Sequence, residues 1–195
     1  MGRWQPGARE RLERAALDLF LEQGFAETTV PQITARAGLT TRTFFRHFAD
    51  KREVLFAGEE LVPERVARLM AEAPPSLGPM ELITEGLAPT AAEIFEGRSL
   101  DYLLRRRAAI DAEPALHERE LRKFSLMAEA LEQGFRDRGV DDLTAQLAAE
   151  IAVTTFRIAV TRWLNQHGDT DLPATINQTL AAMRQLTNED VVKDS

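Results

Sequence analysis

The sequence predicts an all-α protein of about nine helices, and three observations support this prediction. Apolar residues recur at the 3.6-residue spacing of a helix along nearly the whole chain. Alternating β-branched runs and Asn-Gly hairpin signals are absent from the sequence. The composition, 44% hydrophobic and 28% charged over 195 residues, is that of a globular protein with a sizeable core.

The nine helices are expected over about 8–23, 29–37, 40–48, 50–72, 80–96, 100–112, 114–138, 142–166 and 173–187. In the first, the apolar residues share one face and Gly24 provides the stop; they are Leu12, Ala16, Leu19 and Phe20. Thr29, Thr40 and Asp50 are N-cap residues for the second, third and fourth helices. Gly38 can adopt the positive φ that a tight reversal between the second and third needs.

Prolines and glycines mark the remaining helix ends. Pro63 lies inside the expected fourth helix and predicts a kink or a break nearby, because proline removes a backbone hydrogen bond and clashes with the preceding turn. Residues 73–79 form the clearest loop, and Pro89 predicts a second kink in the fifth helix. Pro114 suits the first position of the seventh helix, and Gly139 suits its end.

Several kinds of function lack their sequence signals. With no cysteine, the chain has neither thiolate nucleophiles nor disulfides. The motif that opens at His117 has leucine where a zinc protease needs a second histidine, and no phosphate-binding or dinucleotide glycine pattern occurs. We therefore expect no metal, no cofactor and no enzyme. No secretory signal and no run of about 18–20 apolar residues is visible, so a cytoplasmic protein away from membranes is expected.

The net charge of −7 is unevenly distributed. Residues 1–58 carry nine basic and seven acidic residues, whereas the rest of the chain carries 15 and 24. Within 28–52, five basic residues are accompanied only by Asp50. A basic segment on an acidic body indicates that the N-terminal part meets a polyanion. The overall negative charge argues against an architectural, nucleoid-type DNA-binding protein.

The second and third helices have the spacing of a helix-turn-helix motif over about 29–48. The run that carries it is Thr28-Thr29-Val30-x-x-Ile33-x-x-x-Ala37-Gly38-Leu39-Thr40-x-x-Thr43-Phe44-Phe45-Arg46-His47-Phe48-x-x-Lys51-x-x-Leu55. This run resembles the DNA-binding domain of the TetR family of bacterial transcriptional regulators. The family commonly has tyrosine where this chain has Phe45, which removes one hydroxyl contact to a phosphate.

The resemblance implies a DNA-binding domain over 8–58, a ligand-binding and dimerisation domain over 59–187, and a flexible tail over 188–195. It also implies a homodimer that binds a palindromic operator as a repressor and is released by a small-molecule effector. An activator or a ligand-independent regulator of the same fold stays open. A helical enzyme with an incidental helix-turn-helix is a remote alternative, because no acid–base constellation is visible in the C-terminal part.

The residues expected to contact DNA are Thr29, Thr40, Thr41, Arg42, Thr43, Phe45, Arg46, His47 and Lys51. Arg42 suits bidentate recognition of guanine at the start of a groove-bound helix, with a phosphate contact as the alternative. Thr41 and Thr43 can reach base edges, or have no sequence-reading role. Four of the set suit phosphate contacts: Thr29, Arg46, His47 and Lys51.

The C-terminal part offers apolar residues rather than motifs. Those expected to line an effector pocket are Met70, Met80, Ile83, Leu87, Phe95, Tyr102, Phe124, Met127, Leu131 and Phe156, although any helical core contains the same types. The last two helices are apolar on two sides, which predicts a dimer interface, with a monomer core as the alternative. The interface residues expected are Leu147, Ile151, Phe156, Ile158, Trp163, Ile176, Leu180 and Met183. The run 105–107 of three arginines is expected to be solvated or paired locally with Asp101, Asp111 or Glu113. Alternatively, one of the three meets an acidic effector or couples to the DNA-binding domain.

Overall fold

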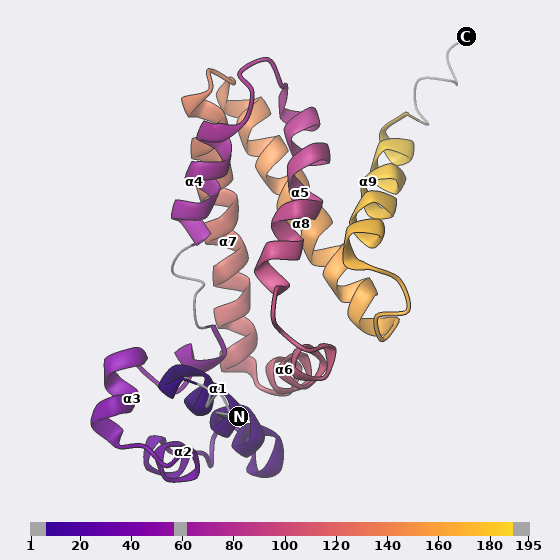
Figure 1. The fold of residues 1–195 in the computed structure, drawn as a ribbon. Helices are drawn as coiled ribbons and strands as arrows, with labels where there is room; N and C mark the ends of the chain where they lie inside the picture. Colours follow the sequence, from indigo (N-terminus) through magenta and orange to yellow (C-terminus); the bar gives the residue numbers. More distant parts are fainter. Residues whose placement is uncertain (1–6, 57–61, 189–195) are drawn as a thin grey trace, which may run out of the picture. The chain divides into compact units, whose positions relative to one another are not determined.

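The computed structural model describes residues 7–56 and 62–188, and the described residues are helical without strands (Figure 1). The elements are α1 (Ala8–Gln23), α2 (Val30–Ala37), α3 (Thr41–His47), the 3₁₀ helix η1 (Glu53–Phe56), α4 (Val62–Glu72), α5 (Pro79–Phe95), α6 (Leu100–Ala112), α7 (Pro114–Asp137), α8 (Asp142–Asn165) and α9 (Leu172–Asn188). The predicted fold class is confirmed.

The chain divides into two compact units. The first takes in the described parts of residues 1–60 together with 101–123, and the second those of 61–100 and 124–195. The helix α7 is continuous across this division, so its N-terminal half belongs to the first unit and its C-terminal half to the second. The domain boundary expected at 58/59 and nearly all of the expected tail lie outside the described residues.

The expected caps form the helix-turn-helix. The side chain of Thr29 accepts from the backbone N–H of Gln32, while Gln32 accepts from the backbone N–H of Thr29 at 2.8 Å, which satisfies two free donors of α2. Thr40 caps α3 through the backbone N–H of Thr43 at 3.2 Å. Between the helices Gly38 has φ 63°, a left-handed conformation that glycine adopts without steric cost.

The first unit has its own apolar core. Large side chains of α1, α2, α3 and η1 are fully or almost fully buried there, among them Leu12, Leu17, Ile33, Phe44, Leu55 and Phe56. Three residues of α6 and α7 complete the core: Ala109, Ile110 and Leu116. The three N-terminal helices therefore do not bury their apolar faces by themselves, and part of α6 and α7 covers them.

The expected fourth helix over 50–72 is wrong in its first half. The Asp50 carboxylate accepts from the backbone N–H groups of Arg52 and Glu53 at 2.7 and 3.3 Å, which favours a turn followed by η1. The helix α4 begins at Val62, so Pro63 lies in its first turn. Proline costs no intrahelical hydrogen bond in the first turn, so the expected kink is absent from α4, whereas the expected interruption of the helix near Pro63 agrees with the start of α4 at Val62. Residues 57–61 lie outside the described parts.

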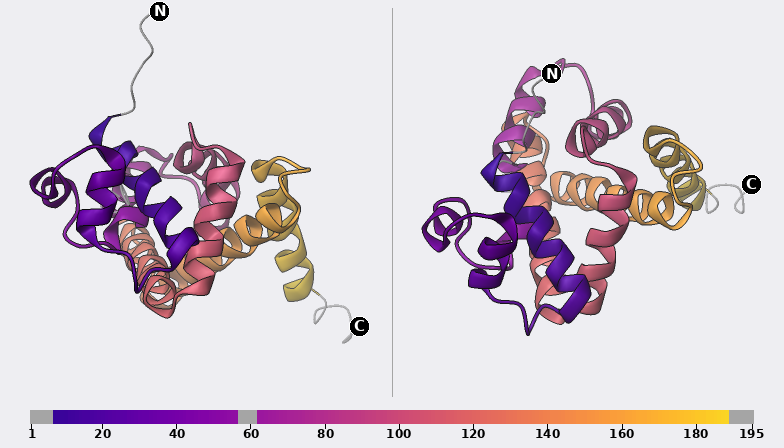
Figure 2. Two further views of the ribbon diagram at one scale, coloured as in Figure 1. Left: turned by 90° about the horizontal axis from the view of Figure 1, so that it is seen from below. Right: turned by 60° about the horizontal axis from the view of Figure 1, so that its bottom comes forward.

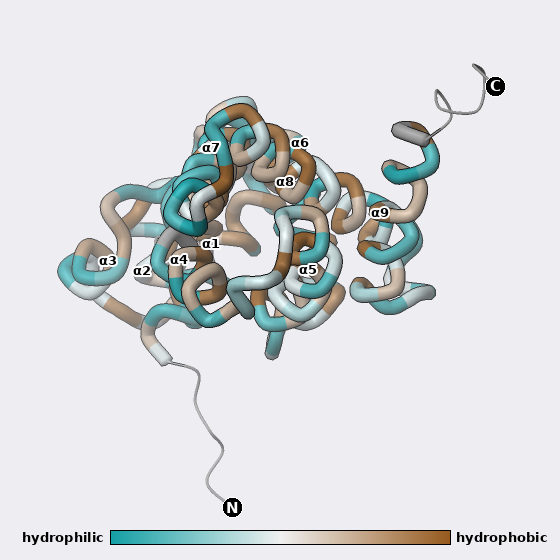
Figure 3. The backbone as a smooth tube through the Cα atoms, turned by 90° about the horizontal axis from the view of Figure 1, so that it is seen from above, coloured by the Kyte–Doolittle hydropathy of each residue, from teal (hydrophilic) through white to brown (hydrophobic). Residues whose placement is uncertain are grey.

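In the second unit, α8 packs against both α5 and α9, and α9 also packs against α5 (Figures 1 and 2). Buried alanines on α8 permit close helix approach: Ala145, Ala148, Ala149, Ala152 and Ala159. Hydrophobic residues recur along all three helices (Figure 3). Of the helices described, α8 is long and apolar enough by composition to span a membrane, which is also the character of a core helix.

Candidate nucleic-acid interface and ligand cavity

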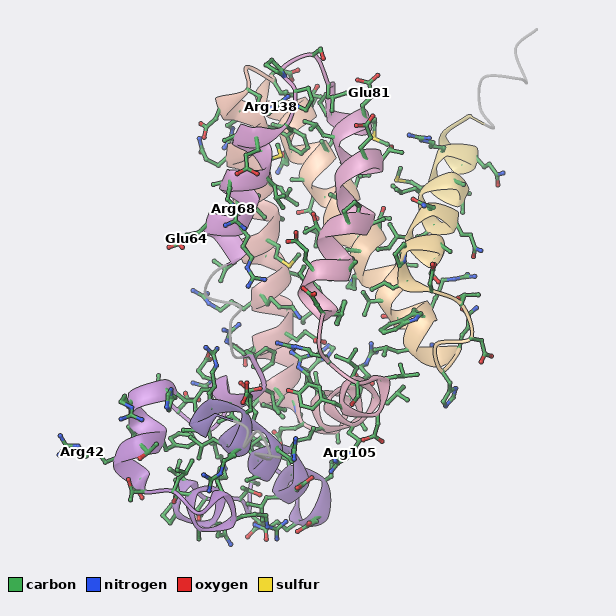
Figure 4. All side chains as sticks on the ribbon, viewed as in Figure 1. Arg42, Glu64, Arg68, Glu81, Arg105 and Arg138 are labelled. Atoms are coloured by element: carbon green, nitrogen blue, oxygen red, sulfur yellow. The ribbon has the colours of Figure 1, made fainter. Side chains whose placement is uncertain are left out.

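The helix α3 presents a polar, cationic surface to solvent. Its exposed residues are Thr41, Arg42, Phe45, Arg46 and His47, whereas Phe44 is fully buried and holds the helix to the core. Arg42 extends from α3 away from the rest of its unit (Figure 4). Among the described residues it has neither a hydrogen bond nor an ion pair, so its five donors are available to a partner.

Phe45 is 56% exposed, which is unusual for a ring with no polar atom. It stands edge-to-face on the buried Phe44, with ring centroids 5.4 Å apart, so its position on α3 is fixed. An exposed and immobilised ring next to Arg46 can pack on the sugars of a nucleic-acid backbone. The hydroxyl that a tyrosine would add there is missing, as the sequence indicated.

The hydroxyls of the interface are partly occupied by capping. Thr40 and Thr43 share a hydrogen bond of 3.0 Å between their hydroxyl oxygens. Thr29 donates to the Gln32 side-chain oxygen at 2.9 Å. These threonines stay at the N-termini of α2 and α3, where the first backbone N–H groups favour anions, so their positions still suit phosphate contacts.

Lys51 has a different environment from the one expected. Its ammonium group donates to the backbone carbonyls of Phe25, Ala26 and Thr28 at 2.6, 3.2 and 2.9 Å. The same group lies 4.3 Å from the centre of the Phe25 ring. Because an ammonium has three donors, all of them are used inside the unit. This geometry favours a structural role, clamping the turn between α1 and α2, over the phosphate contact expected from the sequence.

Sequence reasoning missed Arg11, which holds the helix-turn-helix from α1. Its guanidinium donates to the backbone carbonyls of Ala37 and Gly38, the last residue of α2 and its C-cap. Arg36 forms a second link, with both carboxylate oxygens of Glu22 at 2.6 and 2.7 Å. No local pattern could reveal Arg11, because 26 residues separate the guanidinium from its partner.

The three-arginine run 105–107 has a separate partner for each residue. Arg105 pairs with Asp18 of α1 at 2.5 Å, and Arg107 pairs with Asp111 on its own helix at 2.6 Å. Arg106 donates to the Leu55 carbonyl of η1 at 2.8 Å. One member is therefore paired locally as expected, and two connect α6 to the N-terminal helices of the same unit.

A second cluster connects α7 to η1. Arg119 pairs with both oxygens of Glu53 at 2.7 and 2.9 Å, and its guanidinium lies 4.8 Å from the centre of the Phe56 ring. Burial acts to raise the pKa of Glu120, but the charges of Lys123 and Arg106 outweigh it and hold that pKa below its ordinary value. The cluster is a network of mostly half-buried ion pairs, which fixes α7 to η1.

The second unit contains a cavity of about 360 Å³ between α4, α5, α7 and α8. Six of the ten expected pocket residues line it: Met70, Ile83, Leu87, Met127, Leu131 and Phe156. Other lining residues escaped the sequence analysis, among them Val66, Leu69, Ile94, Phe135 and Ala152. Gly134 allows α4 to approach α7 here, because a Cβ atom at this position would lie 2.8 Å from Met70 Cγ.

Four expected pocket residues lie elsewhere. Tyr102 packs against the core of the first unit, while Met80 and Phe124 pack against that of the second. Phe95 stacks on Phe156 with ring centroids 6.2 Å apart. The physical reason is register, since each points from its helix toward a neighbouring core layer and not toward the cavity.

Arg138 fixes the chain at one end of this cavity. Its guanidinium donates to the carbonyls of Met70, Ala73 and Pro74 at 2.8, 3.1 and 2.6 Å, so it caps the C-terminus of α4 (Figure 4). Ala73 and Pro74 line the cavity as well. Arg138 is again a residue that sequence reasoning missed, because its partners lie more than 60 positions earlier.

Comparison with known proteins identifies the N-terminal part of the chain. Residues 13–57 match the model of the bacterial regulatory proteins of the tetR family. Over 175 residues the chain is 29% identical to the HTH-type transcriptional regulator TcmR of Streptomyces glaucescens, covering 85% of this chain and 76% of TcmR. Residues 13–57 are therefore a DNA-binding domain of the tetR family of transcriptional regulators. Such relatives are regulators, not enzymes.

Solved TetR-family structures share the fold of this regulator. A TetR-family regulator from Syntrophomonas wolfei superposes with a TM-score of 0.65 at 18% identity, covering 96% of this chain and 98% of that one. SmeT in complex with triclosan superposes with a TM-score of 0.60 at 23% identity, covering 90% of each chain. These similarities extend the resemblance in fold over the C-terminal helices, where the sequence contains no motif.

The structure changes the expected dimer surface of this protein. Phe156, Ile176 and Leu180 are buried in the core of their own unit, so we no longer count them as interface residues. Ile151, Trp163 and Met183 are half-buried and pack against that core. Leu147 and Ile158 of α8 are 54% and 44% exposed, and Leu143 and Leu186 are exposed too. Sequence periodicity could not separate the two sets, because both faces of α8 are apolar.

Proposed function

We propose that this protein is a cytoplasmic repressor that binds a palindromic operator as a homodimer and is released by a small molecule in the cavity of its second unit. The observation that carries the proposal is the pairing of an exposed cationic recognition helix with a separate apolar cavity in one chain. SmeT, similar in fold, is known in complex with triclosan, and NalD of Pseudomonas aeruginosa is a repressor of a multidrug efflux pump. Both support a ligand-responsive repressor.

In the proposed complex α3 enters the major groove. Arg42, which has no partner among the described residues, reads a guanine through its O6 and N7 atoms. Arg46 and His47 contact phosphates, together with the helix N-termini at Thr29 and Thr40. Phe45 packs on the sugar–phosphate backbone. Two copies would place their α3 helices about one turn of DNA, roughly 34–36 Å, apart.

The exposed apolar stripe on α8 is the proposed dimer interface. Leu143 and Leu147 lie four residues apart, and Ile158 follows after eleven more, so the three share one helix face. An exposed row of large apolar side chains on one helix face is typical of a protein–protein contact. Leu186 of α9 is exposed in the same way.

Transmission of the effector signal is proposed to follow α7. The N-terminal half of this helix holds η1 through Arg119, and its C-terminal half lines the cavity with Met127, Leu131 and Phe135. A ligand that displaces the lining residues therefore acts on the same rigid helix that grips the DNA-binding unit. The chain crosses between the two units at 60–61, 100–101 and 123–124, so α4 is not the sole covalent route from one unit to the other.

Selection of binding sites from a randomised duplex library tests the DNA-binding part. The full-length protein should enrich a palindrome, and a reporter gene behind that palindrome should be expressed less when the protein is present. Enrichment of no sequence, or a reporter that is activated, would overturn the repressor assignment. For the effector part, a compound that releases the DNA must be bound less tightly by the DNA complex, by the same factor.

A further inference from the structure

The inner surface of the cavity offers almost nothing for a hydrogen bond. Its buried lining consists of apolar side chains, among them Met70, Ile83, Met127 and Phe156. The hydroxyl of Thr90, which also lines it, already donates to the Gly86 carbonyl at 2.7 Å. Any polar group of a ligand that points into this cavity therefore lacks a hydrogen-bond partner. Burying each such group without a partner costs binding free energy. Shape and apolar area are what the cavity can recognise.

The ionisable residues that line the cavity are all of one sign. They are Glu72, Glu85 and Glu93, which are exposed and therefore lie at its opening. Within the part of the chain that the structure describes, none of the three has an ion pair or a side-chain hydrogen bond. Lysine, arginine and histidine are absent from the described residues that line the cavity.

Arg65 and Arg68 of α4 flank the lining residues Val66 and Leu69 along the chain but do not themselves line the cavity, and two further arginines of the same unit are engaged elsewhere. The Arg138 guanidinium donates hydrogen bonds to the carbonyls of Met70, Ala73 and Pro74 and so caps the C-terminus of α4. Arg184 donates to the Thr84 hydroxyl at 2.6 Å. A carboxylate or sulfonate entering the cavity would meet three uncompensated negative charges at the opening and an apolar interior, without a cation to pair with.

We propose that the effector is a lipophilic molecule that is neutral or positively charged, and that anions of the same size and shape are rejected. This inference rests on the proposed function, since it names the class of molecule for the same cavity. The volume of about 360 Å³ lies at the lower end of drug-sized ligand sites. A compact, multi-ring molecule fits these limits, whereas fatty-acid carboxylates and phosphorylated carriers do not.

We call this preference for neutral and cationic molecules over anions the charge rule. Two pairs of matched probes test it with the full-length protein. Tetraphenylphosphonium and tetraphenylborate have the same shape and opposite charge, and N-phenyl-1-naphthylamine differs from 8-anilinonaphthalene-1-sulfonate only in the sulfonate. Equilibrium dialysis should show the cation and the neutral amine bound at least tenfold more tightly than their anionic partners. Equal or tighter binding of either anion, or no binding of any probe, would overturn the inference.

Variants locate the binding. Leu131→Trp fills the cavity and should abolish binding of both favoured probes, while Leu121→Trp adds the same ring at an exposed site of the same helix, outside the cavity, and should leave binding unchanged. Circular dichroism checks that both proteins fold. The triple variant Glu72→Gln, Glu85→Gln, Glu93→Gln changes exposed side chains alone. It should reduce the preference for the phosphonium over the borate at least threefold. The affinity for the neutral amine should stay the same. An unchanged preference would overturn the electrostatic part.

A separate measurement distinguishes this inference from the proposed function. Release of operator DNA is followed by fluorescence anisotropy at saturating probe. Probes that obey the charge rule without releasing DNA would contradict the effector function and support the charge rule. An organic acid that binds in the cavity and releases DNA would contradict the charge rule and support the effector function.

Discussion

At the scale of single residues, two cations of the same DNA-binding unit have opposite environments. Arg42 is exposed and has no partner among the residues described, whereas the Lys51 ammonium donates to three backbone carbonyls. Both are basic residues in the same motif, so their sequence context suggested the same kind of contact. Their environments differ because of the turn from Phe25 to Thr28, whose carbonyls accept the hydrogen bonds of the Lys51 ammonium.

Arg42→Ala should relax the base preference at one position of each half-site. The loss is expected to be about 1–3 kcal/mol at the preferred base pair and much smaller at a substituted one. Titration of the selected operator and of its single-base variants measures it. Arg68→Ala, on α4 and also exposed, is the matched control (Figure 4). A uniform loss across all duplexes would make Arg42 a phosphate contact instead.

Lys51→Met keeps the apolar stem and removes the ammonium group. It should lower the free energy of unfolding by about 1.5–3 kcal/mol, because the variant leaves three carbonyls without their charged donor. Urea denaturation measures this loss. The dependence of DNA affinity on salt should keep its slope, since no phosphate contact is removed. A slope reduced by about one, with unchanged stability, would restore the phosphate assignment.

At the scale of elements, η1 is the junction of the first unit, because both α6 and α7 are attached to it. Its residues Val54, Leu55 and Phe56 are buried, and α6 and α7 hold it through Arg106 and Arg119. The two guanidinium groups lie 5.0 and 4.8 Å from the centre of the Phe56 ring. A four-residue 3₁₀ helix has little stability of its own, so its position depends on these neighbours.

Arg119→Ala should weaken the communication between cavity and DNA. Operator affinity without effector should change by less than about threefold, while the coupling free energy, typically 1–3 kcal/mol, should fall by at least half. Arg122→Ala lies one helical turn away, is exposed, and is the control. Anisotropy titrations with and without a releasing compound give both numbers. Undiminished coupling in Arg119→Ala would show that α7 does not carry the signal.

Glu120 makes the junction sensitive to acid. Its pKa is lowered in the folded protein, so its stabilising contribution is complete above the ordinary pKa of 4.5 and is lost as the pH falls below it. The stability of the wild-type protein should therefore decrease between about pH 5 and pH 3. Glu120→Gln should be less stable at pH 7 and show a shallower decrease. The exposed Glu118→Gln is the control; identical pH profiles for wild type and Glu120→Gln would contradict the assignment.

At the scale of the whole molecule, the chain combines two compact units that share one helix. The DNA-binding motif is completed by α6 and the N-terminal half of α7, and the cavity by the C-terminal half. A regulator needs its two sites to exchange free energy, and a helix common to both units offers a direct path. The exposed apolar stripe on α8 is the proposed surface for joining two such chains.

The double variant Leu147→Glu, Ile158→Glu should remain folded and sediment as a monomer, whereas the wild type should sediment at about twice 21.8 kDa. Both side chains are exposed, so the charges disturb an interface and not the core. Leu121→Glu on α7, likewise exposed, should stay dimeric. Phe156→Glu should instead unfold the second unit. A wild-type monomer, or a double variant that still dimerises, would refute the proposed interface.

The sequence by itself determined most of the helices, the caps of α2 and α3, and the exposed polar face of α3. Caps such as Thr29 and the turn at Gly38 depend on residues within a few positions, and α3 shows its polar face because Phe44 must be buried. Tertiary structure alone decided the rest. The partners of Arg11, Lys51 and Arg138 lie 23 or more positions away, and no periodic pattern encodes them. Apolar spacing predicts that a residue is buried, but it does not predict which element buries it. Cavity-lining, core and interface residues could therefore be distinguished only from the packing of the helices.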